Sequence, residues 1–556
     1  MKNRIILLVA MLVSLSVFAQ EAPLIYKVTF RDKHQSDFSV NRPEEFLSRR
    51  ALERRQRYDV PVTDDDLPIS PSYIRSLENS GARILARSRW LNMVIVELES
   101  NQDSDQISRM QFVERMEEAS TITAIKKNGK PFFMVEQTDI PFFKPSPKNT
   151  STAVSFDYGP SLNQVDMING LPLHHDGYTG KGIIIAVLDA GFRAADTMAV
   201  FDSLWMQNRM LGTKDFVNPG GDIFEPSIHA HGTMVLSIMA GNLPGQLVGT
   251  APDAGYYLIR TEDGTAEYKL EEYYWMMGAE YADSLGADII NSSLGYTEFD
   301  DPADNHTYQD MDGNTTPVTI GADKAAERGI LVCNSAGNSG NSPWKYIGAP
   351  ADGDSVLSVG AVDPLGRWAT FSSLGPSSDG RTKPDIAAQG QQTIIATPWG
   401  GVTAGNGTSF SSPVIAGMTA CLWQAKRSFT NMQIISAIMK SSRQYNTPDD
   451  TLGYGIPDYS LAKSLLDTTD VEMGTLQIYP NPFSQSIEFW INLPDHQKVK
   501  VFIFDITGKQ IFFREIELFK GISQVTLENP VRVSGLYILK VQTQNESLVG
   551  KIIHTQ

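Results

Sequence analysis

Four polar residues stand at positions where they could hydrolyse an amide bond. That reaction needs a nucleophile, a general base, a group that orients the base, and a donor for the developing oxyanion. Asp189 ends the apolar run of GIIIAVLDAG, and His231 lies in HAHGTMVLSIMAG. Ser409 lies in GNGTSFSSPVIAGMTACLW, and Asn338 lies in CNSAGNSG after another apolar run. These four side chains could supply the four functions.

The elements that would position these residues are strands that end, and helices that begin, at one edge of a sheet. The pattern predicts that Asp189 ends a strand, so that its carboxylate emerges at the carboxyl edge of a parallel sheet. The Gly-Thr and apolar residues after His231 predict the first turn of a buried helix. We expect Ser409 just before another helix, with Gly407 permitting a tight approach and Pro413 near the first helical turn.

Taken singly, each residue also has a structural interpretation. Asp189 could cap a strand end, His231 could be a buried structural histidine, and Ser409 could be a helix N-cap. Asn338 could be a turn residue beside glycine. Four such residues with glycine neighbours are hard to obtain by chance in one α/β domain, which favours a common site. His229 and His231, with an aspartate upstream, leave a metal site as an alternative.

Apolar runs alternate with helical patterns from Lys181 to about Leu466. The apolar runs are Ile183 to Leu188, Gly255 to Ile259, Ala287 to Ile290, Ile330 to Cys333, Val356 to Val359 and Thr393 to Ile395. The helical patterns include Tyr268 to Leu285, Ile320 to Arg328 and Pro413 to Arg427. This alternation predicts an α/β fold, with a parallel sheet covered by helices on both faces.

Different patterns flank this region. The stretch from Leu24 to about Asn128 predicts a small α+β unit, with strands at Ile25 to Phe30, Leu91 to Leu98 and Ile122 to Lys126, and helices at Pro43 to Arg57, Ser72 to Asn79 and Asp105 to Glu118. The polar stretch from Pro141 to Ser155 predicts an exposed linker. From Leu476 onward, short alternating runs predict a β-sandwich.

The first residues resemble a secretory signal peptide. Lys2 and Arg4 precede an apolar run from Ile5 to Leu12, and small residues lead to a predicted cleavage after Ala19. A retained anchor helix is the alternative. No later window approaches about 20 apolar residues, so no transmembrane segment is expected. The expected divisions are therefore residues 1–19, 20–150, 151–470 and 471–556.

Composition excludes several classes of function. The chain of 556 residues carries a net charge of −17, which argues against nucleic acid or an anionic membrane as the main partner. Its two cysteines cannot form a disulfide framework. We expect Cys333 and Cys421 to be small buried hydrophobic residues rather than nucleophiles or a bridge.

The motifs between about Tyr158 and Leu466 resemble those of subtilisin-type serine proteases, the subtilases. They include GYTGKGIIIAVLDAG, HGTMV, LVGTAP, IINSSLG, AGN and GTSFSSPVIAG. The resemblance implies that Ser409 is the nucleophile, His231 the general base and then acid, and Asp189 the orienter of the imidazole. It also implies an oxyanion hole made by Asn338 and the Ser409 N–H, and chemistry that needs no cofactor.

Other residues match the family's substrate-binding segments. The segment that pairs with extended substrate as an added strand corresponds to Ser293, Leu294 and Gly295. The wall of the pocket for the residue before the scissile bond corresponds to Ser335, Ala336 and Gly337, with Gly348 deeper in that pocket.

The sequence departs from secreted subtilisins in the segments that could bind calcium. The loop from Gly241 to Val248 lacks their Asn-rich calcium-binding run. An insertion after Tyr296 contains acidic and amide side chains that resemble part of a calcium loop, with Asp310 and Asp312 as the weak candidates beside Asp300, Asp301, Asp304 and Asn314. A solvated acidic loop is the alternative, because the distal glutamate of a full loop motif is missing.

The flanking regions resemble a subtilase propeptide and the C-terminal sorting domain of type IX secretion in Bacteroidetes-like bacteria. The sorting-domain resemblance is carried by IYPNPF (Ile478 to Phe483), by Gly508 in DITGK, by SGLYILKVQT and by Lys551. It implies secretion, or exposure on the outer cell surface, via the periplasm. The alternatives are an independent N-terminal binding domain and a sandwich that binds a ligand or carbohydrate.

Together these features predict a secreted serine endopeptidase made as a zymogen, which cleaves proteins or peptides through an acyl-enzyme. Its own propeptide would inhibit it, and the C-terminal domain would engage the secretion machinery. The alternative is a catalytically lapsed subtilase-fold binding or adhesion protein. An esterase would usually carry G-x-S-x-G, which the segment from Gly407 to Ser411 does not match.

Overall fold

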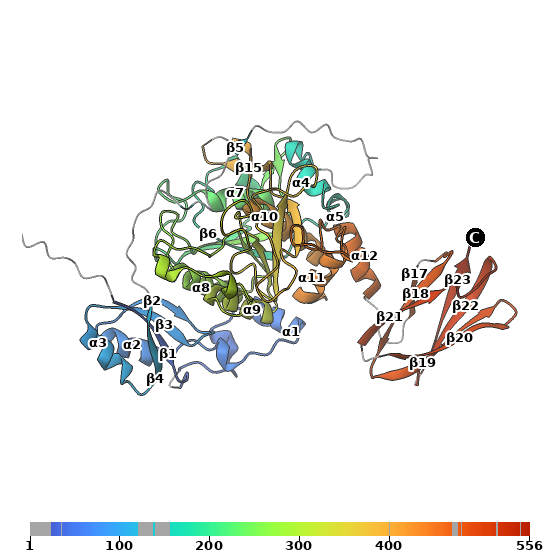
Figure 1. Cartoon of the computed structure of the whole chain (residues 1–556), viewed down its shortest axis with the longest axis horizontal. Helices are drawn as coiled ribbons and strands as arrows, with labels where there is room; N and C mark the ends of the chain where they lie inside the picture. The colour runs from blue at the N-terminus through green and yellow to red at the C-terminus, as the bar shows by residue number, and fades with distance from the viewer. Residues whose placement is uncertain are drawn as a thin grey trace, which may run out of the picture.

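The computed structural model describes residues 24–119 except 35, residue 130, residues 137–138, residues 156–469 except 400, and residues 476–555 except 480, 519, 520 and 545. The predicted signal cleavage, the predicted strand from Ile122 to Lys126 and the predicted linker lie outside these residues. Figure 1 shows an α/β unit in the middle, an N-terminal unit against two of its helices, and a strand-rich C-terminal unit beside α12 (Tyr459–Thr469).

The central sheet is parallel and has seven strands in the order β14-β13-β12-β11-β6-β10-β7. Their bounds are β6 Ile184–Asp189, β7 Met210–Asp215, β10 Gly255–Arg260, β11 Ile289–Ser292, β12 Leu331–Ser335, β13 Val356–Val362 and β14 Ile386–Gln389. After β6 the chain forms β7 and β10 on one side of β6, and it then crosses to form β11 on the other side. Ligands of open α/β sheets bind where the strand order reverses in this way, at the carboxyl ends.

Helices cover both faces of this sheet, as the sequence predicts. The helices α7 (His231–Ala240) and α10 (Thr408–Ala425) share one hydrophobic cluster with the sheet, and α8 (Leu270–Leu285) and α9 (Pro317–Glu327) share another. Every residue of α10 from Thr408 to Trp423 is buried. A helix that is apolar on all sides belongs in the core of a large domain, and α10 accordingly packs between the sheet and its neighbours.

One predicted strand of the sheet is placed wrongly. The run from Thr393 to Ile395 forms β15 (Thr393–Thr397), which pairs antiparallel with β16 (Gly401–Gly405) outside the seven-stranded sheet. The edge strands β7 and β14 complete the sheet instead. Apolar runs identify strands, but they do not specify which strand pairs with which. The partner of β15 is β16 because the chain turns back on itself shortly after β15.

The N-terminal unit is a four-stranded antiparallel sheet with helices. Its strand order is β2-β3-β1-β4, with β1 Leu24–Phe30, β2 Arg83–Ser88, β3 Met93–Leu98 and β4 Val113–Ala119. Its helices are α1 Arg49–Arg57, α2 Pro71–Asn79 and α3 Asn101–Ser108, and a 3₁₀ turn spans Pro43–Glu45.

Two helix predictions in this unit are partly wrong. The single helix expected from Pro43 to Arg57 is broken into the 3₁₀ turn and α1. The helix expected from Asp105 to Glu118 ends with α3, and β4 follows it. Because β4 pairs with β1 along its whole length, a sheet edge overrides the local helical pattern.

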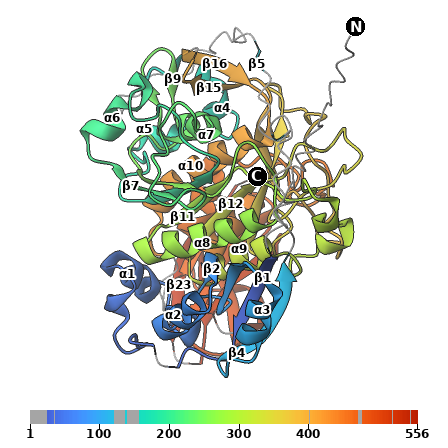
Figure 2. The same ribbon diagram turned by 90° about the vertical axis from the view of Figure 1, so that its left-hand side faces the viewer.

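The N-terminal unit packs against α8 and α9, as both views show (Figures 1 and 2). Asp283 of α8 is fully buried and pairs with Arg54, with Arg55 at 3.0 Å and with Arg89 at 2.8 Å. Glu280 accepts hydrogen bonds from the Oγ of Ser88 and from the next two backbone N–H groups. The contact therefore buries charges of α8 that would face water without the N-terminal unit.

The C-terminal unit consists of two antiparallel sheets around one core, which confirms the predicted sandwich. One sheet contains β17 Leu476–Tyr479, β18 Ser486–Leu493 and β21 Gly521–Glu528. The other contains β19 Gln497–Asp505, β20 Gln510–Leu518, β22 Gly535–Gln542 and β23 Ser547–His554. Within the described residues, no helix has the length and apolar character needed to span a bilayer.

Candidate active site

Asp189 and His231 meet at the carboxyl edge of the central sheet. Asp189 is the last residue of β6, and His231 is the first residue of α7, as the sequence predicts. The imidazole Nδ1 lies 2.9 Å from Oδ1 and 3.0 Å from Oδ2 of Asp189, and both side chains are buried. Because an ionised carboxylate only accepts, Nδ1 carries the proton and Nε2 is the basic nitrogen.

The glycine after the histidine permits this contact. A Cβ at Gly232 would lie 2.6 Å from the carbonyl oxygen of Gly191 and 2.9 Å from the Cβ of Asp189. Those separations are shorter than real Cβ atoms tolerate. The start of α7 therefore approaches the end of β6 only because residue 232 has no side chain, which explains the His-Gly pair in physical terms.

Ser409 lies at the start of α10, and its Oγ donates to the carbonyl oxygen of Ser293 at 3.4 Å. Its neighbour Phe410 stacks on the His231 ring, with centroids 6.2 Å apart. Ser409 is the second residue of α10 and not a residue before it, and the N-cap is Gly407. The N-cap interpretation of Ser409 is therefore wrong, and Pro413 stands at the sixth helical position rather than in the first turn.

Asn338 presents its amide nitrogen close to the start of α10. Its Oδ1 accepts two hydrogen bonds of 2.9 Å, from the N–H and the Oγ1 of Thr408, so that the carboxamide orientation is fixed. A Cβ built on Gly407 would lie 3.6 Å from Nδ2 of Asn338 and 3.7 Å from the N of Ser409. Two N–H donors therefore border the same small space beside Gly407. The sequence did not predict the role of Thr408.

The segments expected to bind substrate flank this space. Ser293, the residue after β11, donates from its Oγ to the carbonyl oxygen of Ser409 at 2.9 Å. The carbonyl of Leu294 accepts from Asn334 at 3.0 Å. Immediately after Gly295, the backbone pairs antiparallel with Ala349. The structure thus brings the Ser293–Gly295 segment directly against the nucleophile candidate.

The expected pocket wall also lies close by. Ser335, Ala336 and Gly337 are buried, and the N–H of Gly337 donates to Thr408 Oγ1 at 3.2 Å. A Cβ on Gly337 would lie 4.0 Å from the N of Gly348, which places Gly348 next to this wall. The hydroxyl of Ser335 is buried without a hydrogen-bond partner in the described structure.

The weak calcium candidates serve as local caps. Asp310 accepts from the N–H and Oγ1 of Thr307, and Asp312 accepts from the N–H groups of Asn314 and Thr315. Neither belongs to a group of three metal-ligating side chains in the described part of the chain. Among the described residues, His229 does not belong to such a group either. Its Nδ1 accepts a hydrogen bond from the N–H of His231, and burial lowers its pKa to about 4.

The two cysteines are buried free thiols, as predicted. Burial raises the pKa of Cys333 to about 12 and that of Cys421 well above its ordinary value. Neither thiol is available as a nucleophile at neutral pH, because the thiolate is the reactive form.

Sequence reasoning missed a group of three carboxylates. Glu262, Glu267 and Glu271 offer oxygens that all lie within 4.8 Å of one another, and no other group of this kind occurs among the described residues. Their crowding in EDGTAEYKLEE is the only signal that could have indicated them. We refer to these three residues as the acidic cluster.

Comparison with known proteins agrees with this geometry. The model of the subtilase family matches residues 180–455. Subtilisin of Bacillus pumilus is 31% identical over 285 residues, which cover 51% of this chain and 90% of that protein. The chain belongs to the subtilase family. Subtilisin NAT of Bacillus subtilis subsp. natto is also 31% identical, and the aligned part of this subtilase spans 65% of that protein's length.

The flanking units of this subtilase match families of their own. A propeptide domain of S8 peptidases from Bacteroidota matches residues 25–131, and a secretion system C-terminal sorting domain matches residues 477–555. Fervidolysin from Fervidobacterium pennivorans, described as a keratinolytic enzyme related to subtilisin, has a similar fold, with a TM-score of 0.53 and 18% identity over 93% of this chain and 70% of that chain. The predicted family, propeptide and sorting domain are confirmed.

Proposed function

We propose that this subtilase is a serine endopeptidase made as a zymogen, with Ser409, His231 and Asp189 as its catalytic triad. The observation that carries the proposal is the double contact of His231 Nδ1 with the Asp189 carboxylate, together with the stacking of Phe410, the residue after Ser409, on the His231 ring. This contact leaves Nε2 as the base. A lapsed site would have no reason to retain all parts of this arrangement.

Each group has one role in the proposed reaction. Ser409 Oγ attacks the peptide carbonyl carbon while His231 Nε2 takes its proton, and Asp189 stabilises the imidazolium. The tetrahedral oxyanion receives hydrogen bonds from Asn338 Nδ2 and the Ser409 N–H. His231 then protonates the leaving amine, which produces the acyl-enzyme. Water, deprotonated by His231, hydrolyses the ester and restores Ser409.

Protein or peptide substrates would bind in extended form. The backbone of Ser293, Leu294 and Gly295 would pair with substrate as an added strand, which provides affinity with little sequence preference. Ser335, Ala336, Gly337 and Gly348 would border the side chain before the scissile bond. The chemistry needs no cofactor, because protein groups supply the nucleophile, the base and the donors.

The N-terminal unit would act as an intramolecular inhibitor until the chain is cut. Its match to a propeptide family and its buried ion pairs with Asp283 support this role. We propose residues 20–150 as propeptide and linker, 151–470 as the catalytic domain and 471–556 as the sorting domain, after a signal peptide at 1–19. The sorting-domain match supports export through type IX secretion, via the periplasm, to the medium or cell surface.

Active-site labelling tests the proposal. A fluorophosphonate should label the processed protein on one residue, identified as Ser409 by peptide mass mapping, and His231→Ala should abolish labelling. Processed wild-type protein that takes no label and cleaves no peptide library would instead support the alternative, a binding or adhesion protein on a subtilase scaffold.

A further inference from the structure

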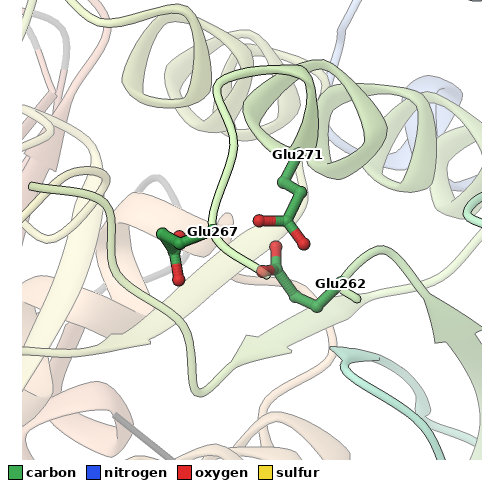
Figure 3. Close-up of side chains that lie close together, drawn as sticks. All are labelled: Glu262, Glu267 and Glu271. Atoms are coloured by element: carbon green, nitrogen blue, oxygen red, sulfur yellow. The ribbon is translucent and has the colours of Figure 1, made fainter. Parts of the chain in front are cut away.

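The acidic cluster lies outside the groups used in the proposed reaction. Glu262 follows the end of β10, Glu267 lies in the loop after it, and Glu271 lies in the first turn of α8. Figure 3 shows the carboxylates of Glu262 and Glu271 facing each other, with Glu267 beside them. Three carboxylates so close repel one another strongly in a buried place, so the cluster requires a cation or protons.

Lys130 supplies that cation in the zymogen. Its Nζ lies 2.5 Å from Glu262, 2.7 Å from Glu271 and 3.2 Å from Glu267, and its side chain is 2% exposed. Lys130 belongs to the stretch that matches the propeptide family. A basic side chain from the part of the chain that maturation removes is therefore seated in a site made by the catalytic domain.

Donors of the catalytic domain hold Glu262 and Glu271 in place independently of Lys130. Tyr296 donates from its hydroxyl to Glu262. The N–H of Asp263 donates to Glu271 Oε1 at 2.7 Å, and the N–H of Tyr268 reaches Glu271 Oε2 at 3.2 Å. These donors all follow Asp189 in the chain, so they remain after the propeptide leaves. The arrangement is preorganised for a cation, which lowers the cost of binding one.

The single positive charge of Lys130 does not neutralise the three carboxylates of the acidic cluster. Burial raises the pKa of Glu267 to about 7 and that of Glu271 well above its ordinary value, although Lys130 opposes both shifts. Burial alone would lower the pKa of Lys130, but the carboxylates more than reverse this and raise it well above the ordinary value. A positive side chain is thus held in its charged form here.

The cluster adjoins the proposed active site. The N–H of Thr261, directly before Glu262, donates to the carbonyl oxygen of Asp189 at 3.0 Å. A Cβ on Gly264 would lie 2.9 Å from the Cβ of His229. Tyr296 directly follows the proposed substrate-pairing segment that ends at Gly295. The cluster is therefore bordered by the same loops and strand end that carry the triad and the substrate-pairing strand.

We propose that, in the processed enzyme, Glu262, Glu267 and Glu271 form a substrate subsite that binds a lysine or arginine side chain at one fixed position away from the scissile bond. Lys130 occupies this subsite in the zymogen. The inference rests on the proposed endopeptidase function and adds a substrate class to it: extended peptides with a basic residue at that position.

Matched peptides test the subsite. Quenched fluorescent peptides would carry one lysine at successive positions around a single bond, and at each position norleucine and glutamine would replace it. For processed wild-type enzyme we expect lysine to raise kcat/KM about 10- to 100-fold over norleucine at one position only, as for hydrogen bonds to a buried charged group. If the enzyme cleaves the peptides but prefers lysine at none of the positions, the proposed subsite is wrong while the endopeptidase function stands.

Variants assign the preference to the cluster. Glu262→Gln with Glu271→Gln should reduce the lysine-to-norleucine ratio to about 1. Glu298→Gln removes an exposed carboxylate from the insertion outside the cluster and should leave the ratio unchanged. A ratio that survives the double substitution would show that another group binds the lysine, and the assignment would be wrong.

Small competitors keep the test independent of whether the double variant folds. Pentylammonium, a mimic of the lysine side chain, should inhibit cleavage of the lysine peptide by wild-type enzyme more than that of the norleucine peptide, and pentanol should not discriminate. If millimolar Ca²⁺ binds the processed enzyme and removes the lysine preference, the cluster is a metal site and the inference fails. If no peptide is cleaved and no fluorophosphonate label appears, the proposed function fails and the subsite fails with it.

Discussion

Ser293 donates a hydrogen bond from its Oγ to the carbonyl oxygen of Ser409 at 2.9 Å. Pro413 lies four residues after Ser409 in α10 and has no N–H, so this carbonyl lacks the helical donor that would normally lie four residues on. The Oγ of Ser409 in turn donates to the carbonyl of Ser293 at 3.4 Å. The proposed substrate-pairing segment therefore holds the proposed nucleophile at its side chain and its main chain.

Ser293→Ala should destabilise the catalytic domain and slow acylation. The substitution leaves a buried carbonyl without a donor, which costs about 1–3 kcal/mol. We expect a lower unfolding temperature and a slower rate of fluorophosphonate labelling. Ser411→Ala is a matched control, because the buried Ser411 hydroxyl bonds only to Thr408 of its own helical turn. Equal effects of the two substitutions would contradict the role of Ser293.

Ser409→Ala should leave the chain uncut between residues 141 and 157. The proposed self-cleavage needs the Ser409 hydroxyl as nucleophile, and alanine removes it with little change in volume. Mass spectrometry of the N-termini of the secreted protein measures the outcome. Normal processing of the variant would show that another protease matures the chain.

Asn338→Ala should lower kcat by about 10²–10³-fold, because it removes one donor to the oxyanion. The alanine also removes the acceptor for Thr408, so a second variant is needed to separate the two effects. Asn338→Asp retains an oxygen that can accept from Thr408 but presents no amide N–H. Recovery of kcat in Asn338→Asp would indicate that Asn338 only positions the start of α10.

Gly232→Ala should displace the His231 imidazole. The new Cβ would lie within 3 Å of Gly191, Phe192 and Asp189, so the start of α7 must move away from β6. Overpacking of this kind costs about 1–3 kcal/mol, and the Asp189 contact would lengthen. We expect a lower unfolding temperature together with a large loss of kcat. Unchanged activity and an unchanged unfolding temperature in Gly232→Ala would refute the steric argument.

Acid should weaken the contact between the N-terminal unit and α9 through Asp66. Burial raises the pKa of this carboxyl, but Arg55 and Arg328 more than reverse that effect and lower it from 3.8 to about 2. A lowered folded-state pKa means that the stabilisation is complete above about pH 4 and is lost as the pH falls toward 2. The loss amounts to about 2 kcal/mol.

Hydrogen exchange of β2 and β3 in the uncut Ser409→Ala chain measures this effect. Protection should fall between pH 4 and pH 2, and Asp66→Asn should reduce that dependence. Asp65→Asn is the control, because Asp65 is exposed and its carboxylate pairs with Lys324 at the surface. A pH dependence that Asp66→Asn leaves unchanged would show that other carboxyls control the contact.

The sequence alone determined the family and the class of fold, and it predicted which residues could carry the chemistry. Asp189 ends a strand and His231 begins a helix, as the apolar runs beside them predict, because burial on a sheet or a helix face is a local pattern that a few neighbours encode. The sequence also shows glycines at 232 and 407 close to the candidates His231 and Ser409. The tertiary structure shows which atoms pack against these two glycines.

Only the tertiary structure decided which distant residues meet. The pairing of the edge strand β4 with β1 and the bond from Ser293 to Ser409 join segments whose partners no local period specifies. Lys130 lies 132 residues before Glu262, yet its ammonium is buried among three carboxylates. Such contacts arise because the folded chain must neutralise buried charge and satisfy buried carbonyls with whatever groups packing brings near. Residue types therefore predicted the proposed triad, and long-range packing determined which groups contact its members and formed the acidic cluster proposed as a substrate subsite.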